Sequence, residues 1–331
     1  MRYKTLGKSG IKLSTVTIGT WAMGATDYGT TQREDAIAAV GEMLNQGVNH
    51  IDTAWIYGCG GSDKIVGDAL KQLGVARDRI YITTKCGFRN NQDPSQPNFP
   101  DCSPEWITKC FEESLVNLGT DYVDFFLIHV PDKNVPFTET AAVVNKWIKE
   151  GKVRYAGVSN FGVTDIEEMS KYLDITANQS GLSMLNRGEQ TNMEWCRDHG
   201  IGVMTHSSLA QGMLTGVIKE FPRYDAGDVR MKYGSIWYTN KAVFDAVQTD
   251  LLDVLRQMSA EIGKPVAQIS LNWNTQKDFV TTSLCGVRNV HEAKENCAAA
   301  NWELTSDEME AIDAAIARMD THIKDILSEQ K

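Results

Sequence analysis

Four polar residues stand at or just past the ends of hydrophobic runs, and these residues are Asp52, Tyr57, Lys85 and His129. The runs have the composition of buried β-strands and cover residues 48–52, 81–85 and 123–129. If these strands are parallel neighbours, their carboxyl ends meet at one rim, and the four side chains gather there. A carboxylate, a phenol, an ammonium and an imidazole at one rim would make a proton-donating site.

The chemistry of such a site follows from the acidity of its tyrosine. A phenol with a pKa near ~10 is a weak acid at neutral pH, but a neighbouring ammonium stabilises the phenolate. Lys85 could act on Tyr57 in this way, and Asp52 would keep the buried ammonium charged. His129 would then position a substrate oxygen. Each residue alone has an ordinary structural explanation, but their joint occurrence at three strand ends favours the functional interpretation.

Eight strand-like runs alternate with segments of helical periodicity, and they cover residues 16–19, 48–54, 81–85, 123–129, 155–159, 175–179, 202–206 and 279–285. Because an open doubly wound sheet more often has five to seven strands, eight of them predict an α/β fold of the (β/α)8 barrel type. We expect a single domain over residues 1–331. The first twelve or so residues predict a β-hairpin that plugs the barrel floor. An aromatic-rich segment, residues 210–241, follows the seventh strand and is interpreted as a lid.

Several short patterns predict where the helices begin and end. Thr31, Thr164 and Thr305 each precede a Glu by three residues, which is the spacing of a capping box. Ser103 before Pro104 fits a cap followed by proline at the first helical position. Left-handed helix stops are expected at glycines 47, 74, 119, 151 and 200.

The segment Gly58-Cys59-Gly60-Gly61-Ser62 could be taken for a dinucleotide-binding glycine loop, but its spacing fails. Asp63 stands where the third glycine would be, and its carboxylate would repel a pyrophosphate. The sequence instead favours Ser62 as the cap of the helix that follows.

Composition narrows the class of protein. The chain has 331 residues and a formal net charge of -10, which argues against a nucleic-acid or an anionic membrane partner. Its start is too polar for a signal peptide, and its apolar stretches are shorter than the roughly 18 residues of a membrane span, so we expect a soluble, cytoplasmic protein. Seven cysteines without a C-x-x-C pair indicate neither a disulfide framework nor a zinc ribbon.

The opening run Ile51-Asp52-Thr53-Ala54-Trp55-Ile56-Tyr57-Gly58, followed by the strand-end Lys85 and the strand-end His129, resembles the aldo-keto reductases. The resemblance extends from Met1 to about Met319. It implies an oxidoreductase that transfers a hydride between NAD(P)H and an aldehyde or ketone, such as a sugar or another small carbonyl compound. In that family's pattern Tyr57 is the general acid, and Asp52, Lys85 and His129 are its partners.

The resemblance also implies cofactor contacts after several strand ends, from Gly19, Thr20, Trp21, Asp52, Ser159, Asn160, Gln179, His206, Ser207, Ser208, Leu209, Gln211, Gly212, Gly286, Val287, Arg288, Glu292, Glu295 and Asn296. Ser159, Asn160 and Gln179 would hold the nicotinamide carboxamide, and residues 207–212 would wrap the pyrophosphate. An ordinary loop is the alternative for the latter. The chain departs from the family at His206, where many members have a tyrosine that stacks on the nicotinamide.

The choice between NADP and NAD depends on two residues of opposite charge, Arg288 and Glu292. Arg288 could pair with the 2′-phosphate of NADP, whereas Glu292 would repel it unless Arg288 offsets the repulsion. A solvated helix face is the alternative for Glu292 and Glu295. We expect a modest preference for NADP, with NAD as the other candidate.

Residues after the strand ends could also wall a substrate pocket, and the candidates are Trp21, Trp55, Phe88, His129, Val130, Trp237 and Tyr238. Aromatic faces suit aromatic aldehydes and the C–H faces of sugars equally well. Val130 replaces a tryptophan of many relatives, so that side should be roomier. Core packing is the alternative for Trp21 and Trp55.

Two other classes of function are alternatives. A barrel kept for binding or redox sensing, like the channel-associated members of the family, would bind the cofactor without needing turnover. A metal-dependent hydrolase would use His129, His206 and Asp52, but the sequence lacks H-x-H and H-E-x-x-H patterns. The intact set of four strand-end residues weakens the binding or sensing alternative, and the lack of a second histidine near any strand end weakens the hydrolase alternative.

Overall fold

The computed structural model describes residues 1–24, 29, 31–91, 96–225 and 228–330. Its centre is a closed barrel of eight parallel strands, which are β3 (Val16–Gly19), β4 (His50–Asp52), β5 (Tyr81–Cys86), β8 (Val123–Ile128), β9 (Val153–Ser159), β10 (Ile175–Gly181), β11 (Gly202–His206) and β12 (Thr282–Gly286). Each strand overlaps one of the eight predicted runs. The largest differences are at β4 and β12, which are shorter than the apolar runs that they overlap. The barrel prediction is confirmed.

Strands of this barrel are buried on both sides, and that explains their continuous apolar sequences. All six residues of β8 are buried, for example. Between the strands and the outer helices lies the larger core, and a smaller core of Leu6, Leu13, Phe125, Ala177, Met204 and Leu284 lies inside the barrel.

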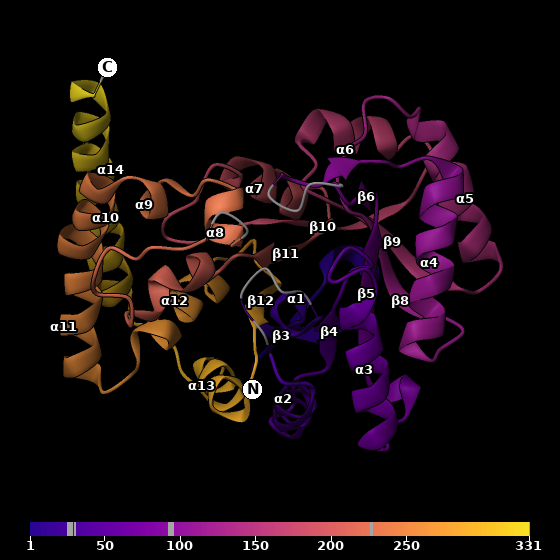
Figure 1. Cartoon of the computed structure of the whole chain (residues 1–331), viewed down its shortest axis with the longest axis horizontal. Coiled ribbons are helices and arrows are strands. Elements are labelled where there is room, and N and C mark those ends of the chain that lie inside the picture. The colour runs from indigo at the N-terminus through magenta and orange to yellow at the C-terminus, as the bar shows by residue number, and fades with distance from the viewer. Residues whose placement is uncertain (25–28, 30, 92–95, 226–227, 331) are drawn as a thin grey trace.

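Helices surround the strands (Figure 1). They include α2 (Arg33–Asn45), α3 (Gly61–Gln72), α4 (Pro104–Leu118), α5 (Phe137–Lys149), α6 (Val163–Met169), α7 (Gln190–Asp198), α10 (Lys241–Ala246), α11 (Asp253–Ile262), α12 (Val266–Thr275), α13 (Val290–Ala299) and α14 (Ser306–Glu329). A π-helical stretch, η4 (Val247–Leu252), joins α10 to α11. The strand and helix alternation carries the carboxyl end of every barrel strand to the same rim.

The predicted caps are confirmed in part. Ser103 accepts a hydrogen bond from the Trp106 N–H, and Thr305 forms a capping box with Glu308. The expected stops are also confirmed, with φ between 64° and 93° at glycines 47, 74, 119, 151 and 200.

Three predicted caps are wrong. Gln32 precedes α2, and the Thr31 hydroxyl instead donates to the Ala22 carbonyl. Helix α6 starts one residue before Thr164, because Gly162 is its cap. Gly60 precedes α3, so Ser62 lies inside the first turn and its hydroxyl donates to the Thr20 carbonyl.

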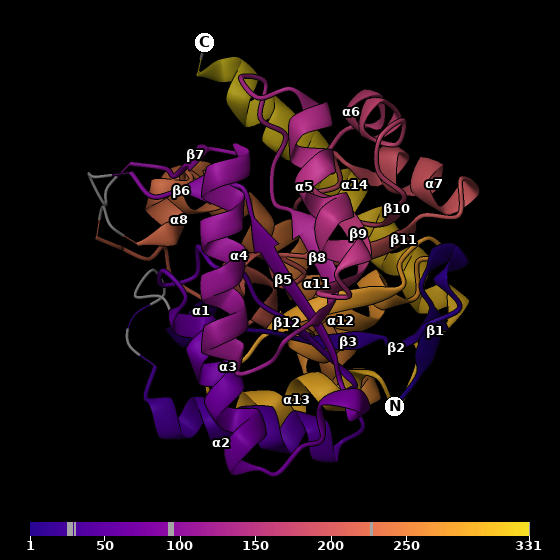
Figure 2. The same cartoon turned by 90° about the vertical axis from the view of Figure 1, so that its right-hand side faces the viewer.

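An antiparallel hairpin closes the floor of the barrel, as predicted. It consists of β1 (Tyr3–Thr5), the short helix η1 (Gly7–Ser9) and β2 (Lys12–Ser14). Leu6 and Leu13 from this hairpin are fully buried in the inner core. Gly7 approaches the Gly200 carbonyl so closely that a Cβ would lie 2.4 Å from the oxygen. Figure 2 shows the hairpin at the opposite end of the barrel from α1, β6 and α8.

Short elements at the rim include α1 (Trp21–Gly24), β6 (Phe88–Arg89) and β7 (Phe99–Pro100). The long segment after β11 contains η3 (Ala210–Thr215), α8 (Val229–Lys232) and α9 (Ile236–Thr239), so much of the expected lid is helical. Residues 226 and 227 of that segment lie outside the described residues.

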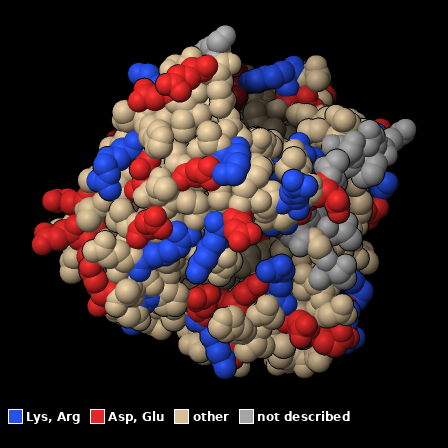
Figure 3. Space-filling model, turned by 60° about the vertical axis from the view of Figure 1, so that its left-hand side comes forward, with Lys and Arg blue, Asp and Glu red and all other residues tan. Residues whose placement is uncertain are grey.

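The surface carries both signs of charge. On the face drawn in Figure 3, Lys and Arg side chains are interspersed with Asp and Glu side chains. Within the described ranges, every helix is too short or too polar to cross a membrane.

Candidate active site

The centre of the site is a buried ion pair between neighbouring strands. Lys85 Nζ donates to Asp52 Oδ1 at 2.5 Å and to the Thr53 carbonyl at 2.8 Å. Both charged side chains are at most 1% exposed. Strand β4 pairs with β5 in parallel, so their carboxyl ends bring the two residues together at the rim.

Tyr57 and His129 complete a cluster with this pair, and we call the four residues the tetrad. Lys85 Nζ lies 5.2 Å from the centroid of the Tyr57 ring. The rings of Tyr57 and His129 are 5.9 Å apart and nearly perpendicular. The four residues predicted from the strand ends therefore meet in the structure.

Burial and charge act in opposite directions on the ion pair. Burial lowers the pKa of Lys85, and the negative charge of Asp52 opposes this shift. Burial likewise raises the pKa of Asp52, and the ammonium and a hydrogen bond from Gln179 oppose it. Each charge is thus the main reason that the other is tolerated in the interior.

His129 is a neutral imidazole at neutral pH. Burial first, and then the charge of Lys85, hold its pKa well below the ordinary value. Its Nδ1 atom is buried and has no hydrogen-bond partner among the described residues. The Phe88 ring packs edge-on against the imidazole at 4.9 Å. A buried imidazole nitrogen without a partner is available to a ligand.

The residues expected to hold a carboxamide lie directly beside the tetrad. Gln179 Nε2 donates to Asp52 Oδ2 at 2.7 Å. The Asn160 amide donates to the His129 carbonyl at 3.0 Å and to Ser159 Oγ at 3.1 Å. Asn160 has a φ of 59°, a conformation that asparagine tolerates better than most residues.

His206, the residue that departs from the family pattern, is half-buried at the end of β11. Its Nε2 donates to Asn160 Oδ1 at 3.0 Å, and its Nδ1 accepts from the Ser207 hydroxyl at 3.0 Å. Burial, and then the charge of Lys85, lower its pKa to about 4. The ring is therefore neutral at pH 7 and fixed by two hydrogen bonds.

Residues 207–212, which were expected to wrap the pyrophosphate, have an unusual backbone conformation. Ser207, Ala210 and Gln211 adopt φ values of 58°, 47° and 56°, and Gly212 follows at 98°. Side-chain-bearing residues at positive φ are uncommon, and they cluster where backbone N–H groups must turn toward a ligand. The buried Ser208 hydroxyl has no partner in the described part of the chain, which fits a phosphate acceptor. Leu209 packs against the core.

The residues of the expected adenosine site lie at the end of β12 and the start of α13. Arg288 Nη2 donates to Glu292 Oε1 at 2.8 Å, and the Arg288 backbone N–H donates to Glu292 Oε2 at 2.8 Å. Asn296 Nδ2 donates to the Gly286 carbonyl at 3.2 Å. The Val287 side chain is buried, and Glu295 is partly exposed. Glu292 therefore pairs with the arginine that was expected to take a phosphate.

Aromatic side chains form one wall beside the tetrad. Trp21 stacks on Tyr57 with ring centroids 5.5 Å apart and an interplanar angle of 11°. Tyr233, from the segment after β11, contacts the Trp21 ring edge-on at 6.3 Å. Val130 is half-buried next to His129, and Trp237 is half-buried farther along the segment.

Two predicted wall residues are placed in the protein core instead. Trp55 is buried, and its indole N–H donates to Glu113 on α4 at 2.7 Å. Tyr238 is also buried, and its hydroxyl donates to the Gln211 carbonyl at 3.1 Å. Core packing, the alternative reading for Trp55, is correct because the aromatic residue after a strand end can point outward as well as inward.

The predicted cofactor residues at the end of β3, Gly19 and Thr20, also have structural partners. The Thr20 N–H and hydroxyl both donate to the Asp52 carbonyl, at 3.2 Å and 3.1 Å. A Cβ on Gly19 would lie 3.1 Å from the Cys285 carbonyl, so the strands approach closely there. These contacts fix the rim end of β4.

Sequence reasoning missed three residues that contact the site or its ion pair. The Thr53 carbonyl binds the Lys85 ammonium, and the buried Asp63 carboxylate accepts from the Thr53 hydroxyl at 2.7 Å. Tyr233 was only one aromatic residue of the expected lid. For Asp63 a signal was present, because it lies in the first turn of the helix that follows Tyr57.

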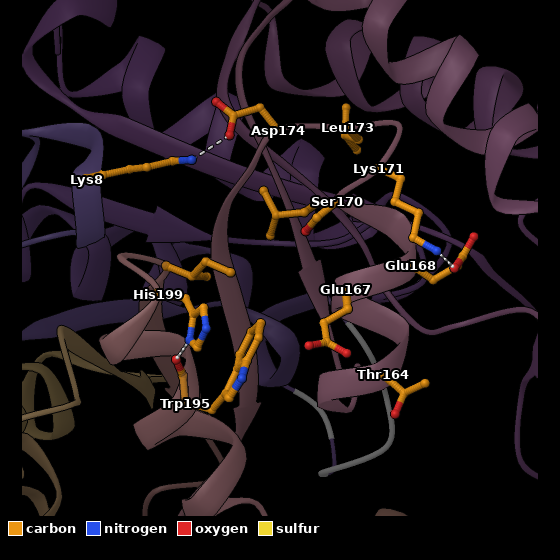
Figure 4. A pocket seen from close by; sticks show the side chains of 12 residues that line it. Lys8, Thr164, Glu167, Glu168, Ser170, Lys171, Leu173, Asp174, Trp195 and His199 are labelled. Carbon is orange, nitrogen blue, oxygen red and sulfur yellow. Dashed lines mark hydrogen bonds and ion pairs between the residues drawn. The ribbon is translucent and has the colours of Figure 1, made fainter.

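A separate hollow of about 720 Å³ lies between α6 and α7 at the floor end of the barrel. Trp195 and His199 lie on one side and Glu167 and Lys171 on the other (Figure 4). None of the tetrad residues lines it. Among the described residues, no group of three or more His, Cys, Asp or Glu side chains is placed to hold a metal ion.

Comparisons with known proteins identify the family. A model of the Aldo/keto reductase family matches residues 15–317. The chain is 32% identical to an NADH-specific methylglyoxal reductase of Escherichia coli, over 92% of this chain and 95% of that protein. It is 29% identical to the aldo-keto reductase YhdN of Bacillus subtilis, over 96% and 94% of the two chains.

A solved structure shares the fold as well as part of the sequence. The glycerol dehydrogenase of Gluconobacter oxydans is similar with a TM-score of 0.80 and 26% identity, over 96% of this chain and 95% of that one. The family match spans most of the chain and includes all eight barrel strands. The chain belongs to the aldo/keto reductase family and is an NAD(P)-dependent oxidoreductase.

Proposed function

We propose that this protein reduces small aldehydes or ketones, with Tyr57 as the proton donor to the carbonyl oxygen. The observation that carries the proposal is the buried Lys85 ammonium, which is held by Asp52 at 2.5 Å and lies 5.2 Å from the Tyr57 ring. A fixed positive charge beside a phenol stabilises the phenolate, and the phenol then gives up its proton more readily. In the oxidative direction the same tyrosine would accept the proton.

His129 acts as the orienting group. Its neutral ring can donate one N–H to a carbonyl oxygen without competing with Lys85 for a negative charge. The nearly perpendicular contact of the two rings, 5.9 Å apart, supports a role for both residues as donors to one oxygen. A carbonyl oxygen that accepts from both residues would be fixed in place for protonation.

The nicotinamide cofactor supplies the hydride when it is bound. Ser159, Asn160 and Gln179 would hold its carboxamide, and residues 207–212 would hold its pyrophosphate. The unpartnered Ser208 hydroxyl and the positive φ values of this loop support that assignment. Gly286, Arg288 and Asn296 would contact the adenosine end.

We further propose that NADH is used at least as well as NADPH. Glu292 takes two of the donors that a 2′-phosphate would need, the Arg288 guanidinium and its backbone N–H. NADPH must displace this carboxylate and then tolerate its charge, which removes most of the advantage that Arg288 alone would give. The name of the Escherichia coli relative, an NADH-specific reductase, is consistent with this proposal.

Short polyols, sugars and their carbonyl forms are the substrates that we propose. Trp21, Phe88 and Tyr233 offer ring faces and edges that suit the C–H groups of short polyols, sugars and their carbonyl forms. Relatives named for methylglyoxal and glycerol act on compounds of this size.

The test is Tyr57→Phe, assayed with a panel of aldehydes, ketones and keto sugars at the nicotinamide absorbance. We expect turnover to fall by about 10² to 10⁴, because a positioned proton donor contributes that much. Cofactor binding, measured by quenching of tryptophan fluorescence, should change little. Near-normal turnover in Tyr57→Phe would remove the catalytic assignment. Tight cofactor binding by a native protein that turns over none of the panel would instead support a binding or sensing role.

A further inference from the structure

A second buried carboxylate lies beneath the tetrad and has no part in the proposed proton transfer. Asp63 lies in the first turn of α3 and is fully buried. Its Oδ1 accepts from the Thr53 hydroxyl at 2.7 Å, and its Oδ2 accepts from the Ser114 hydroxyl at 2.6 Å. Their hydrogen bonds oppose the effect of burial on the pKa of Asp63, but both partners are neutral and supply no positive charge.

The charge of Lys85 also favours the ionised form of Asp63, and Thr53 connects the two side chains. The Thr53 carbonyl accepts from Lys85 Nζ at 2.8 Å, and the Thr53 N–H donates to the Thr83 carbonyl at 2.9 Å. One residue therefore links the Asp63 carboxylate to the tetrad ammonium. Lys85 has a buried carboxylate in direct contact, Asp52, and a second one a single residue away.

The groups that face Asp63 come from three elements. Strand β5 contributes the Lys85 ammonium and the Cys86 thiol, and β4 contributes the Asp52 carboxylate. Helix α4 contributes the neutral Ser114 hydroxyl. Lys85 is the cation among these groups, so it is the group whose protonation a charge at Asp63 favours.

We propose that Asp63 is a positioning residue for the reduction: its carboxylate fixes Thr53 against Lys85 and adds the negative charge that keeps the ammonium protonated beside Tyr57. This inference rests on the proposed function. A purely structural role, such as favourable contact with the α3 dipole, would need neither the bond to Thr53 nor the proximity to Lys85.

The direction of the pH effect follows from the same contacts. Burial raises the pKa of Asp63 to about 6, so the carboxylate is charged above that pH. At alkaline pH the reaction ends when Lys85 loses its proton, because the phenolate is then no longer stabilised. Removal of a nearby negative charge lowers the pKa of an ammonium, so this loss should occur at lower pH without Asp63.

Asp63→Asn is the sharpest variant, because an amide can accept from Thr53 with its oxygen and donate to Ser114 with its nitrogen. We expect the alkaline half-maximum of kcat to move down by about one pH unit, with little change in KM. Ser114→Ala is the matched control, since it removes a bond to Asp63 and keeps the charge. It should lower the unfolding temperature and leave the alkaline limb in place.

An unchanged alkaline limb in folded Asp63→Asn would overturn the inference, and so would an equal shift in Ser114→Ala. Should Asp63→Asn not fold, Asp63→Ser also lacks the charge and must show the same downward shift. Tyr57→Phe distinguishes failure of the proposed function from failure of the positioning role of Asp63. If it is active, the proposed function fails; if it is inactive while Asp63→Asn keeps the wild-type profile, only the positioning role fails.

Discussion

Two polar clusters lie in successive layers of the barrel, and they differ in how completely they are hydrogen-bonded. His50 and Asp52 are two residues apart on β4, so their side chains point to the same side of the strand. The lower layer contains His50, with Thr17 Oγ1 2.8 Å from its Nδ1 and Thr83 Oγ1 2.7 Å from its Nε2. Thr17 also contacts Thr282, at 2.7 Å. Both nitrogens of the buried ring are satisfied.

The upper layer is the tetrad with its surroundings, and it keeps buried polar atoms without partners. These include His129 Nδ1 and Ser208 Oγ, within the described residues. Burial lowers the pKa of both histidines, of His50 to about 3. Low pKa values alone therefore do not distinguish the layers, whereas unpartnered atoms do. The satisfied cluster contributes to the stability of the barrel, and the unpartnered atoms beside the tetrad are available to a ligand.

Lys85→Met should have the largest effect, because it removes the charge at the centre of the upper layer. We expect turnover to fall by about 10² to 10⁴, comparable to loss of the proton donor itself. Asp52 would also be left as an unpaired buried carboxylate, so the unfolding temperature should fall. An activity profile over pH that matches wild type would mean that Lys85 only supports the fold.

Exchange of each histidine for glutamine tests the comparison directly. His129→Gln should lose about 10- to 100-fold in turnover and keep its unfolding temperature, whereas His50→Gln should keep turnover and unfold at lower temperature. Assays and calorimetry at pH 7.5 on both variants give the answer. Equal losses of activity in the two variants would contradict the assignment of His129 to turnover and His50 to stability.

The pH dependence of stability sharpens this test. The folded pKa of His50, about 3, lies below its unfolded value of about 6.5, so folding disfavours protonation. The neutral His50 side chain therefore makes its full contribution to the free energy of unfolding above about pH 6.5. This contribution declines as pH falls toward 3, by at most about 1.4 kcal/mol per pH unit. The gap in unfolding temperature between wild type and His50→Gln should narrow at pH 5.

The preference for NADPH or NADH should depend on the ion pair between Arg288 and Glu292. Glu292→Gln frees the Arg288 guanidinium from its carboxylate, so the ratio of kcat/KM with NADPH to that with NADH should rise severalfold, by about 1 kcal/mol. Arg288→Ala should lower the same ratio, because NADH has no 2′-phosphate to lose a partner. If both variants keep the wild-type ratio, this loop does not contact the adenosine ribose.

The smallest effect is expected at His206, whose ring is held by Asn160 and Ser207. If the imidazole stacks on the nicotinamide, His206→Tyr should tighten cofactor binding by about two- to fivefold, since a phenol ring presents more face area. Fluorescence titration with either nucleotide measures this. Equal dissociation constants for the two forms would show that the ring serves the carboxamide residues and not the cofactor.

Sequence patterns were sufficient where a property is local or repeats along the chain. Apolar runs such as residues 123–129 predict strands because a parallel barrel buries both sides of them. The tetrad followed from these runs, since parallel strands deliver their ends to one rim.

Properties that depend on contacts between distant elements were not predictable in this way. Asp63 was considered only as a misfit in a glycine loop, because its partners Thr53 and Ser114 come from another turn and another helix. Trp55 was misplaced because strand-end position does not fix the side to which the indole turns. The contact between Arg288 and Glu292 could be anticipated from their opposite charges four positions apart in the sequence, although Arg288 itself precedes α13.

The stack of Trp21 on Tyr57 gives the candidate active site a fluorescence signal. The indole lies 5.5 Å from the phenol ring, close enough for efficient energy transfer to a phenolate, whose absorption overlaps indole emission. Ionisation of Tyr57 should therefore dim Trp21, and occupation of the adjacent wall should shift its emission. Trp21 thus serves as a built-in optical reporter, and its signal, isolated by comparison with Trp21→Phe, would follow the proton on the tyrosine in the intact protein.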